Sequence, residues 1–265
     1  MYKCIFCDLD GTLLNDDKKI SSANLKAIER VRAAGVKFVV CTGRLPFCFV
    51  DYIKPLVSED YVAANGSLVH FNGSDVASKY LEYKDSLRLL DYAMERNLRV
   101  RAFMSDYLYI VNGAHIGWSY KEQSDVSFDE LKEIIKTRDI AKLGIVLKPG
   151  QEFVKAETDA LNINAEALYS SSDYLEVNAC GANKGNGIRL FCKEANISLE
   201  EVIGIGDNDN DISMLNTAGL SVCPANGCIN AKEAADVICP VDNNHDAVAW
   251  VINRYVFGEE AQFLN

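Results

Sequence analysis

Short and almost continuous apolar runs recur near both ends of the chain. Each run is about as long as a buried strand and stops at a turn signal such as Asp-Gly or Asn-Gly. Between the runs, apolar residues such as Leu25, Ile28 and Val31 are spaced as on one face of a helix. This alternation is typical of a parallel sheet covered by helices on both faces. The expected strands are residues 2–7, 36–41, 61–64, 202–205 and 220–223.

Helix boundaries are also visible in the pattern. Ser21 or Ser22 is suited to cap the first helix, and Gly35 follows its last turn. A second helix is expected around residues 188–195, a third near 212–215, and a last one over 247–255. We therefore expect an α/β fold with a Rossmann-like, doubly wound parallel sheet.

The middle of the chain has a different texture. A helix is expected at residues 86–96, and runs of mixed or alternating polarity at 98–104, 107–111, 141–147 and 174–177 predict strands with one wetter face. We interpret residues 82–181 as an α+β domain inserted into the core, which then consists of residues 1–81 and 182–265.

Polar clusters follow several of the expected strands. Asp8 and Asp10 end the first strand, Thr42-Gly43-Arg44 ends the second, and an acidic run over residues 206–211 ends a late one. A further cluster at 181–185 opens a helix. Because ligands of open α/β sheets bind at the carboxyl ends of the strands, these clusters are expected to converge on one site.

The residue types in these clusters indicate a phosphoryl group and a hard metal ion. Carboxylates of Asp8, Asp10 and Asp207 are the oxygen ligands that Mg²⁺ prefers. Donors and a positive charge beside them, from Thr42, Gly43 and Lys184, are suited to phosphoryl oxygens.

Composition narrows the class of protein. A net charge of −11 argues against a nucleic-acid surface, which needs clustered Lys and Arg. No apolar run has the length of about 20 residues that a membrane helix needs. The segment before Asp8 does not resemble a leader, and most of the nine cysteines are expected to be reduced apolar filler, so we expect a cytoplasmic protein.

The clusters resemble the motifs of a known family. "DLDGTLL", "CTGR", the lysine of "GANKG" and "GDNDNDISML" are similar to the four motifs of the haloacid dehalogenase-like superfamily. The last motif resembles the version of the Cof-type, sugar-phosphatase-like members, and the long middle segment resembles their type C2 cap. The resemblance covers both core segments.

This resemblance implies a Mg²⁺-dependent phosphatase that acts on small phosphomonoesters, such as sugar phosphates or phosphorylated cofactors. Asp8 would be the nucleophile that forms an aspartyl phosphate, and Asp10 the general acid and base. Asp8, Asp207 and the backbone carbonyl of Asp10 would hold the metal. The remaining residues would bind phosphate (Thr42, Gly43, Lys184 and Asn210) or support the site (Asp211).

Two alternatives stay open, a phosphomutase and a non-catalytic regulator that is phosphorylated on aspartate. A cysteine phosphatase that uses Cys41 is disfavoured, because Arg44 follows three residues later rather than six. Departures from the family pattern after residue 223 leave the substrate open. The roles of Arg101, Tyr107, Trp118 and Tyr120 in the inserted domain stay unassigned, and the sequence indicates no oligomeric state.

Overall fold

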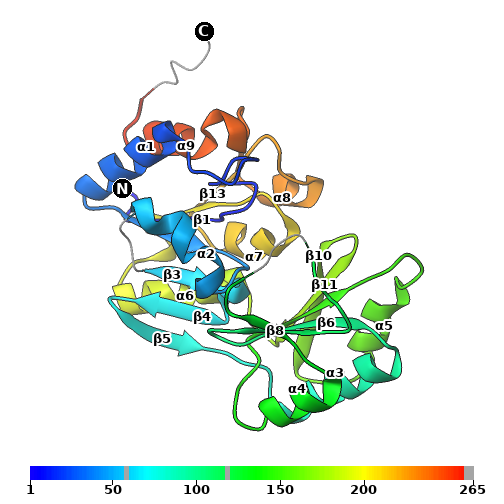
Figure 1. Ribbon diagram of the computed structural model, residues 1–265. Helices are drawn as coiled ribbons and strands as arrows, with labels where there is room; N and C mark the ends of the chain where they lie inside the picture. The colour runs from blue at the N-terminus through cyan, green and yellow to red at the C-terminus, as the bar shows by residue number, and fades with distance from the viewer. Residues whose placement is uncertain (57–59, 117–119, 260–265) are drawn as a thin grey trace. The chain divides into compact units, whose positions relative to one another are not determined.

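The computed structural model describes residues 1–56, 60–116 and 120–259, which form two compact units (Figure 1). The α/β unit comprises Met1–Arg44, Phe49–Ala77 and Asn183–Asn265, and the inserted unit comprises Leu45–Cys48 and Ser78–Ala182. The sequence predicts domain boundaries after residues 81 and 181, with a catalytic core and a cap; this assignment stays a prediction. Trp118 lies outside the described residues.

An eight-stranded sheet forms the centre of the α/β unit. Its order is β14-β13-β12-β1-β2-β3-β4-β5, and the pairs from β14 through β3 are parallel, whereas β3 and β4 are antiparallel. The strands are β1 Cys4–Cys7, β2 Lys37–Cys41, β3 Tyr61–Ala63, β4 Leu68–Phe71, β5 Ser74–Ser78, β12 Val202–Ile205, β13 Leu220–Cys223 and β14 Val237–Ile238.

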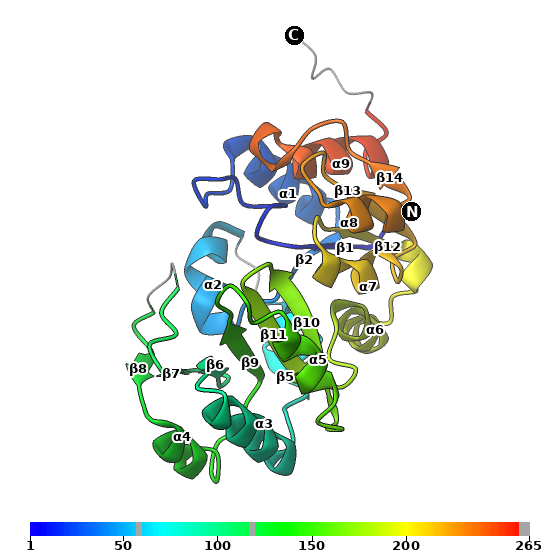
Figure 2. The same ribbon diagram turned by 90° about the vertical axis from the view of Figure 1, so that its right-hand side faces the viewer.

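Helices cover both faces of this sheet. In two views, α1 and α9 lie together on one side, and α6 and α7 lie on the other (Figures 1 and 2). The helices of the unit are α1 Ser22–Ala33, α2 Pro46–Ile53, α6 Lys184–Ala195, α7 Ile212–Leu215, α8 Ile229–Ala234 and α9 Ala247–Tyr255. The first turn of α2 clusters with the inserted unit.

Alternate residues of the central strands pack on opposite faces. Phe6 of β1 meets Phe191 of α6 edge-on, with ring centroids 5.2 Å apart, in a core that also contains Ile188 and Met214. On the other side, α1 and α9 are joined where the side chain of Asn24 accepts a hydrogen bond from the backbone of Ala249. The predicted α/β class with helices on both faces is therefore confirmed, and Ser21 caps α1 as one of the two predicted residues.

The inserted unit contains a six-stranded, largely antiparallel sheet of order β10-β11-β9-β6-β7-β8. Its strands are β6 Arg99–Phe103, β7 Leu108–Val111, β8 Gln123–Asp125, β9 Lys142–Val146, β10 Ala165–Ser171 and β11 Tyr174–Ala179. Its helices are α3 Tyr83–Glu95, α4 Phe128–Ile134 and α5 Phe153–Asp159.

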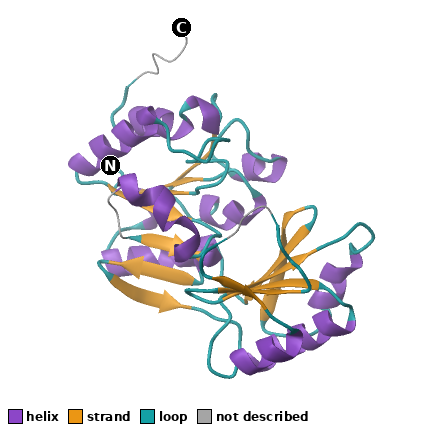
Figure 3. Ribbon diagram, viewed as in Figure 1, coloured by secondary structure: helices purple, strands orange, loops and turns teal. Residues whose placement is uncertain are grey.

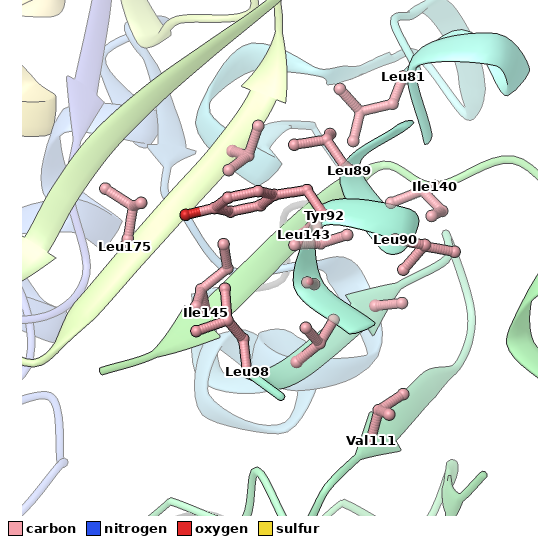
Figure 4. Close-up of a cluster of buried hydrophobic side chains, with 14 of the residues drawn as sticks. Leu81, Leu89, Leu90, Tyr92, Leu98, Val111, Ile140, Leu143, Ile145 and Leu175 are labelled. Carbon is pink, nitrogen blue, oxygen red and sulfur yellow. The ribbon is translucent and has the colours of Figure 1, made fainter. Parts of the chain in front are cut away.

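The three helices pack on one face of this sheet. Leu89 and Leu90 of α3 lie against Leu143 and Ile145 of β9 in a common apolar core (Figure 4). The same core contains residues of α4 and α5. The other face of the central strands carries polar side chains, and Figure 3 shows the different helix and strand content of the two units.

Among the described residues, no helix is long and apolar enough to cross a membrane. The cytoplasmic location stays a prediction.

Candidate active site

The carboxyl ends of β1, β2 and β12 bring three of the predicted clusters together. β1 lies between β2 and β12, with Cys7 in register with both Val40 and Ile205. Asp8 follows directly and donates its backbone N–H to Ile205 at 2.9 Å. Asp207 lies two residues after Ile205, the last residue of β12. Because β1 and β12 are parallel and adjacent, the carboxylates of Asp8 and Asp207 lie at the same edge of the sheet.

Lys184 enters this edge from the start of α6. The side chain of Asn183 caps the helix by accepting from the backbone of Asn186, so Lys184 is its first residue. The Lys184 Nζ donates to Asp8 Oδ1 at 2.6 Å and also forms an ion pair with Asp211. Its side chain is fully buried. Burial lowers the pKa of Lys184, but the two carboxylates outweigh it and raise that pKa above its ordinary value.

Three carboxylates form a compact acidic cluster. Oxygens of Asp8, Asp207 and Asp211 lie within 4.8 Å of one another. Burial raises the pKa of Asp8 well above its ordinary value, and burial together with Asp211 raises the pKa of Asp207 to about 6. Lys184 supplies one positive charge, so three ionised carboxylates leave an excess of negative charge.

This cluster is suited to a divalent cation of the Mg²⁺ type. Asp211 is already engaged, since its Oδ2 accepts from the backbone N–H groups of Asp207 and Asn208 at 2.9 and 3.0 Å. Asp207 is oriented by Thr12, whose hydroxyl donates to its Oδ1 at 2.6 Å. Asp8 and Asp207 are therefore the residues of the cluster that would hold the ion, with Asp211 in support.

Gly11 is required for this arrangement. Its φ of +79° favours glycine, and a Cβ atom there would lie 2.4 Å from Asp207 Oδ2. The glycine that follows the aspartate pair therefore makes room for the third carboxylate.

Asp10 lies outside the acidic cluster. Its carboxylate accepts from Nε and Nη2 of Arg44, both at 2.6 Å, and from Lys18 Nζ at 2.9 Å. Burial raises the pKa of Asp10, but the bonds from Arg44 and Lys18 outweigh it and hold that pKa below its usual value. The predicted ligation of a metal by its backbone carbonyl stays a prediction.

Three of the predicted phosphate-binding residues, Thr42, Gly43 and Asn210, lie beside Asn65, which the sequence did not single out. Asn65 Oδ1 accepts from Asn210 Nδ2 at 3.2 Å, and a Cβ atom on Gly43 would lie 2.8 Å from the same oxygen. Thr42 is buried, and its Oγ1 accepts from the backbone of Arg44 at 3.1 Å. The structure thus brings Thr42, Gly43 and Asn210 together around Asn65. Their predicted role in phosphate binding stays a prediction.

Sequence reasoning missed several residues of this region, among them Thr12, Lys18, Arg44 and Asn65. Thr12 and Arg44 are part of the quoted motifs, but nothing in the sequence tells which carboxylate each one contacts. Asn65 belongs to an Asn-Gly pair that the sequence marks only as a turn signal. It is buried, with a φ of +54° that asparagine tolerates better than most residues.

The thiols near the site are not suited to nucleophilic attack. Cys7 and Cys41 are fully buried, and burial raises the pKa of both thiols. A cysteine with a raised pKa carries little thiolate at neutral pH. This supports a carboxylate rather than a cysteine as the reactive group.

Comparison with known proteins identifies the family. Residues 5–252 match the family model of haloacid dehalogenase-like hydrolases. YxeH of Bacillus subtilis, a candidate phosphatase by name, is 32% identical and covers 98% of this chain and 100% of its own length. YcsE of the same organism, a 5-amino-6-(5-phospho-D-ribitylamino)uracil phosphatase, is 28% identical with 96% coverage of each chain. A chloroplastic protein of Arabidopsis thaliana named endoribonuclease YBEY is 31% identical, but the match spans only 47% of that protein.

Solved structures agree with this result. A HAD/COF-like hydrolase from Plasmodium vivax superposes with a TM-score of 0.86 at 26% identity, over 97% of this chain and 96% of that one. A phosphatase from Bacteroides thetaiotaomicron, at 20% identity and a TM-score of 0.85 over 97% and 96% of the two chains, shares the fold. The predicted fold class, family and phosphatase type of enzyme are confirmed by these matches. The chain belongs to the haloacid dehalogenase-like hydrolases.

Proposed function

We propose that this protein is a Mg²⁺-dependent phosphatase that hydrolyses small phosphomonoesters through an aspartyl phosphate on Asp8. The observation that carries the proposal is the buried contact between Asp8 and Lys184 beside Asp207 and Asp211. Similarity to YcsE, which is named for a phosphorylated ribitylaminouracil, supports a small phosphorylated metabolite as substrate.

Asp8 is suited to act as the nucleophile because one of its oxygens is held by Lys184. Its other oxygen would attack phosphorus as the bond to the leaving oxygen breaks, and the mixed anhydride would then be hydrolysed by water. Lys184, Thr42 and Gly43 would bind the phosphoryl oxygens, with Asn210 in support. Mg²⁺ bound by Asp8 and Asp207 would neutralise charge on the phosphoryl group.

Asp10 is the proposed acid and base. It would protonate the leaving alkoxide and later take a proton from the attacking water. The contacts with Arg44 and Lys18 orient its carboxylate and favour its charged form, which suits the second of these steps. For the first step Asp10 must be protonated, although Arg44 and Lys18 both favour its ionised form.

The test is phosphate release from a panel of phosphorylated sugars, nucleotides and cofactors, with Mg²⁺ and with chelator. We expect release only with metal, and a fall of roughly three orders of magnitude or more in kcat for Asp8→Asn. Asp209→Asn is the matched control, because Asp209 is exposed in the same acidic run and bonds Asn230 instead of joining the cluster.

Full activity of the Asp8→Asn variant would contradict the mechanism. Interconversion of two sugar phosphates without phosphate release would instead indicate a mutase. Stable phosphorylation of Asp8 without turnover would indicate a regulator.

A further inference from the structure

The inserted unit has a polar sheet face that the proposed chemistry does not use. We call it the polar face; it consists of Arg101 on β6, Lys142 on β9, and Tyr174, Glu176 and Asn178 on β11. Their neighbours along each strand, such as Leu143 and Leu175, belong to the helix-covered core. Because side chains alternate along a strand, these five residues lie on the opposite face.

The strand register places the five side chains next to one another. Arg101 pairs with Gly144 of β9, and Gly144 pairs with Glu176 of β11. Lys142 lies two residues before Gly144 on β9, on the same face, and its Nζ donates to Glu176 Oε1 at 2.6 Å.

Gly144 has no side chain, so it leaves space on the polar face between Arg101 of β6 and Glu176 of β11. The Tyr174 phenol occupies that room, because a Cβ atom on Gly144 would meet the Tyr174 hydroxyl at only 1.9 Å. The Tyr174 hydroxyl therefore lies over Gly144, which pairs with Arg101 on one side and Glu176 on the other.

Three buried polar atoms of this face have no hydrogen-bond partner. They are Nε of Arg101, the hydroxyl of Tyr174 and Oδ1 of Asn178. Arg101 and Asn178 are only 3% and 1% exposed. Buried polar groups in folded proteins are nearly always paired, so these donors and acceptors, gathered on one face, are suited to pair with a polar ligand.

The charge of the face is also unbalanced. Glu176 pairs with Lys142, whereas no carboxylate among the described residues forms an ion pair with Arg101. The guanidinium is instead held over the rings of Phe103 and Tyr120, at 5.2 and 6.0 Å from their centroids. A buried guanidinium without an anion is unfavourable, and a ligand that brings one removes the imbalance.

We propose that the polar face binds a small polyhydroxylated ligand that carries an anionic group, a carboxylate or a phosphate. Arg101 would pair with the anion through the fork that contains Nε, and Tyr174 and Asn178 would bind hydroxyl groups. Such a ligand is either the organic part of the substrate, in which case the inference rests on the proposed function, or a separate anionic metabolite.

The test compares binding of matched ligand pairs by calorimetry in chelator, where no turnover is needed. The pairs are D-gluconate 6-phosphate with D-glucose 6-phosphate, and D-fructose 1,6-bisphosphate with D-fructose 1-phosphate. Phosphate-free D-gluconate is added as a third probe. We expect at least one ligand with the extra anion to bind about tenfold more tightly than its partner, and Arg101→Met to remove this difference.

Two variants control the result. Arg101→Lys keeps the charge without the Nε donor and should lose only part of the preference. Arg99→Met removes the same charge from the same strand and face, but the Arg99 guanidinium already donates to the carbonyls of Gly113 and His115. It should leave the preference unchanged, and melting temperatures show whether each variant is folded.

The two sources of the ligand give different results with Mg²⁺. For a substrate, phosphate release shows the same preference in kcat/KM, and Arg101→Met raises KM. For a separate metabolite, binding is tight without hydrolysis of that compound. If wild type shows no preference in any pair, or Arg101→Met retains it, the inference is wrong. Absence of phosphate release from every compound would contradict the proposed function but leave the binding preference measurable.

Discussion

Asp207 belongs to the acidic cluster, and the fold disfavours the ionisation of its carboxyl group. It is packed with Asp8 and Asp211, and the hydroxyl of Thr12 donates a hydrogen bond to its Oδ1 at 2.6 Å. Its pKa of about 6 lies above the ordinary 3.8 because the folded state opposes its ionisation. At pH values above about 3.8, the cost of ionising Asp207 in the folded state therefore lowers the stability of the metal-free protein.

Asp207→Asn is expected to raise the melting temperature of the protein in chelator at pH 7.5. A group with a raised pKa favours folding below its unfolded pKa of 3.8, and this contribution is lost as the pH rises through about 6. The gain from the substitution should therefore be a few degrees at pH 7.5 and roughly a third of that at pH 4.5. Differential scanning calorimetry at both pH values measures it.

Addition of Mg²⁺ provides the control for this prediction. Wild type should be stabilised by Mg²⁺ at pH 7.5, whereas Asp207→Asn should lose most of that stabilisation. A variant that is less stable than wild type in chelator at pH 7.5 would show that the cluster does not need a cation.

For individual residues, the sequence predicts which ones form the site, but it does not predict which hydrogen bonds their side chains make. Asp8, Asp207 and Lys184 could be predicted because each follows a strand or opens a helix in a recognisable motif. The pairing of Asp10 with Arg44, and the contact of Asn65 with Asn210, depend on side-chain directions from separate segments. Those directions are set by packing, which a single sequence does not display.

The start of α6 is the element on which the position of Lys184 depends. Gly66 ends a turn that follows β3 and touches this helix start. A Cβ atom on Gly66 would lie 2.2 Å from the carbonyl oxygen of Asn183, which accepts from Gly187 in the first turn. Close approach of the two backbones therefore requires a glycine.

Gly66→Ala is expected to destabilise the protein and to lower its activity. The clash should move the start of α6, and the φ of +88° adds strain for a residue with a side chain. We expect a loss of roughly 2–4 kcal/mol in the free energy of unfolding, measured with denaturant, and a clear loss of kcat.

Gly73→Ala separates the two causes. Gly73 has a similar φ of +75°, but no heavy atom lies within 4 Å of its Cβ position. It should lose only about 1 kcal/mol and keep full activity. Equal losses in both variants would mean that backbone strain, and not the contact with α6, explains the glycine.

Helices and strands could be predicted from the sequence where their residues are almost all buried. β1, β2, β12 and β13 are short apolar runs whose ends were expected within one or two residues. β5 and β8 are mostly polar and partly exposed, and β14 has only two residues, so none of them gave a signal. The short helices α4, α5 and α8 were missed for a similar reason, because fewer than eight residues show little periodicity.

Over the part of the molecule that the structure describes, most of the cysteines serve as apolar filler, as predicted. All nine are free, and seven of them are buried; Cys228 is partly exposed and Cys180 is exposed. Cys180 donates its thiol to Glu166 Oε1 at 3.4 Å, and this hydrogen bond raises its pKa above the ordinary 9.0.

Labelling of the native protein with a thiol reagent is expected to modify Cys180 first and Cys228 more slowly. All nine thiols should react in denaturant. Because the raised pKa reduces the thiolate fraction of Cys180, Glu166→Gln should lower that pKa and speed its labelling at pH 8. Peptide mass spectrometry identifies the sites.

Cys180→Ser should abolish the fast phase of labelling. Rapid reaction of three or more thiols in the native protein would contradict the burial of the other seven, and an unchanged rate in Glu166→Gln would contradict the assigned cause of the pKa shift.

The order of strands in the α/β unit has a consequence for synthesis of the protein. β1 pairs with β12, so Cys4 must meet Val202, whereas most of the inserted unit is one continuous stretch, Ser78–Ala182. Chains emerge from the ribosome N-terminus first, and distant pairings form late because closing a long loop costs entropy. The inserted unit can thus fold while β1 still waits for its partner. Asp8 can meet Asp207 and Lys184 only after the whole inserted unit has been translated, so a nascent chain acquires its acidic cluster later than the fold of that unit.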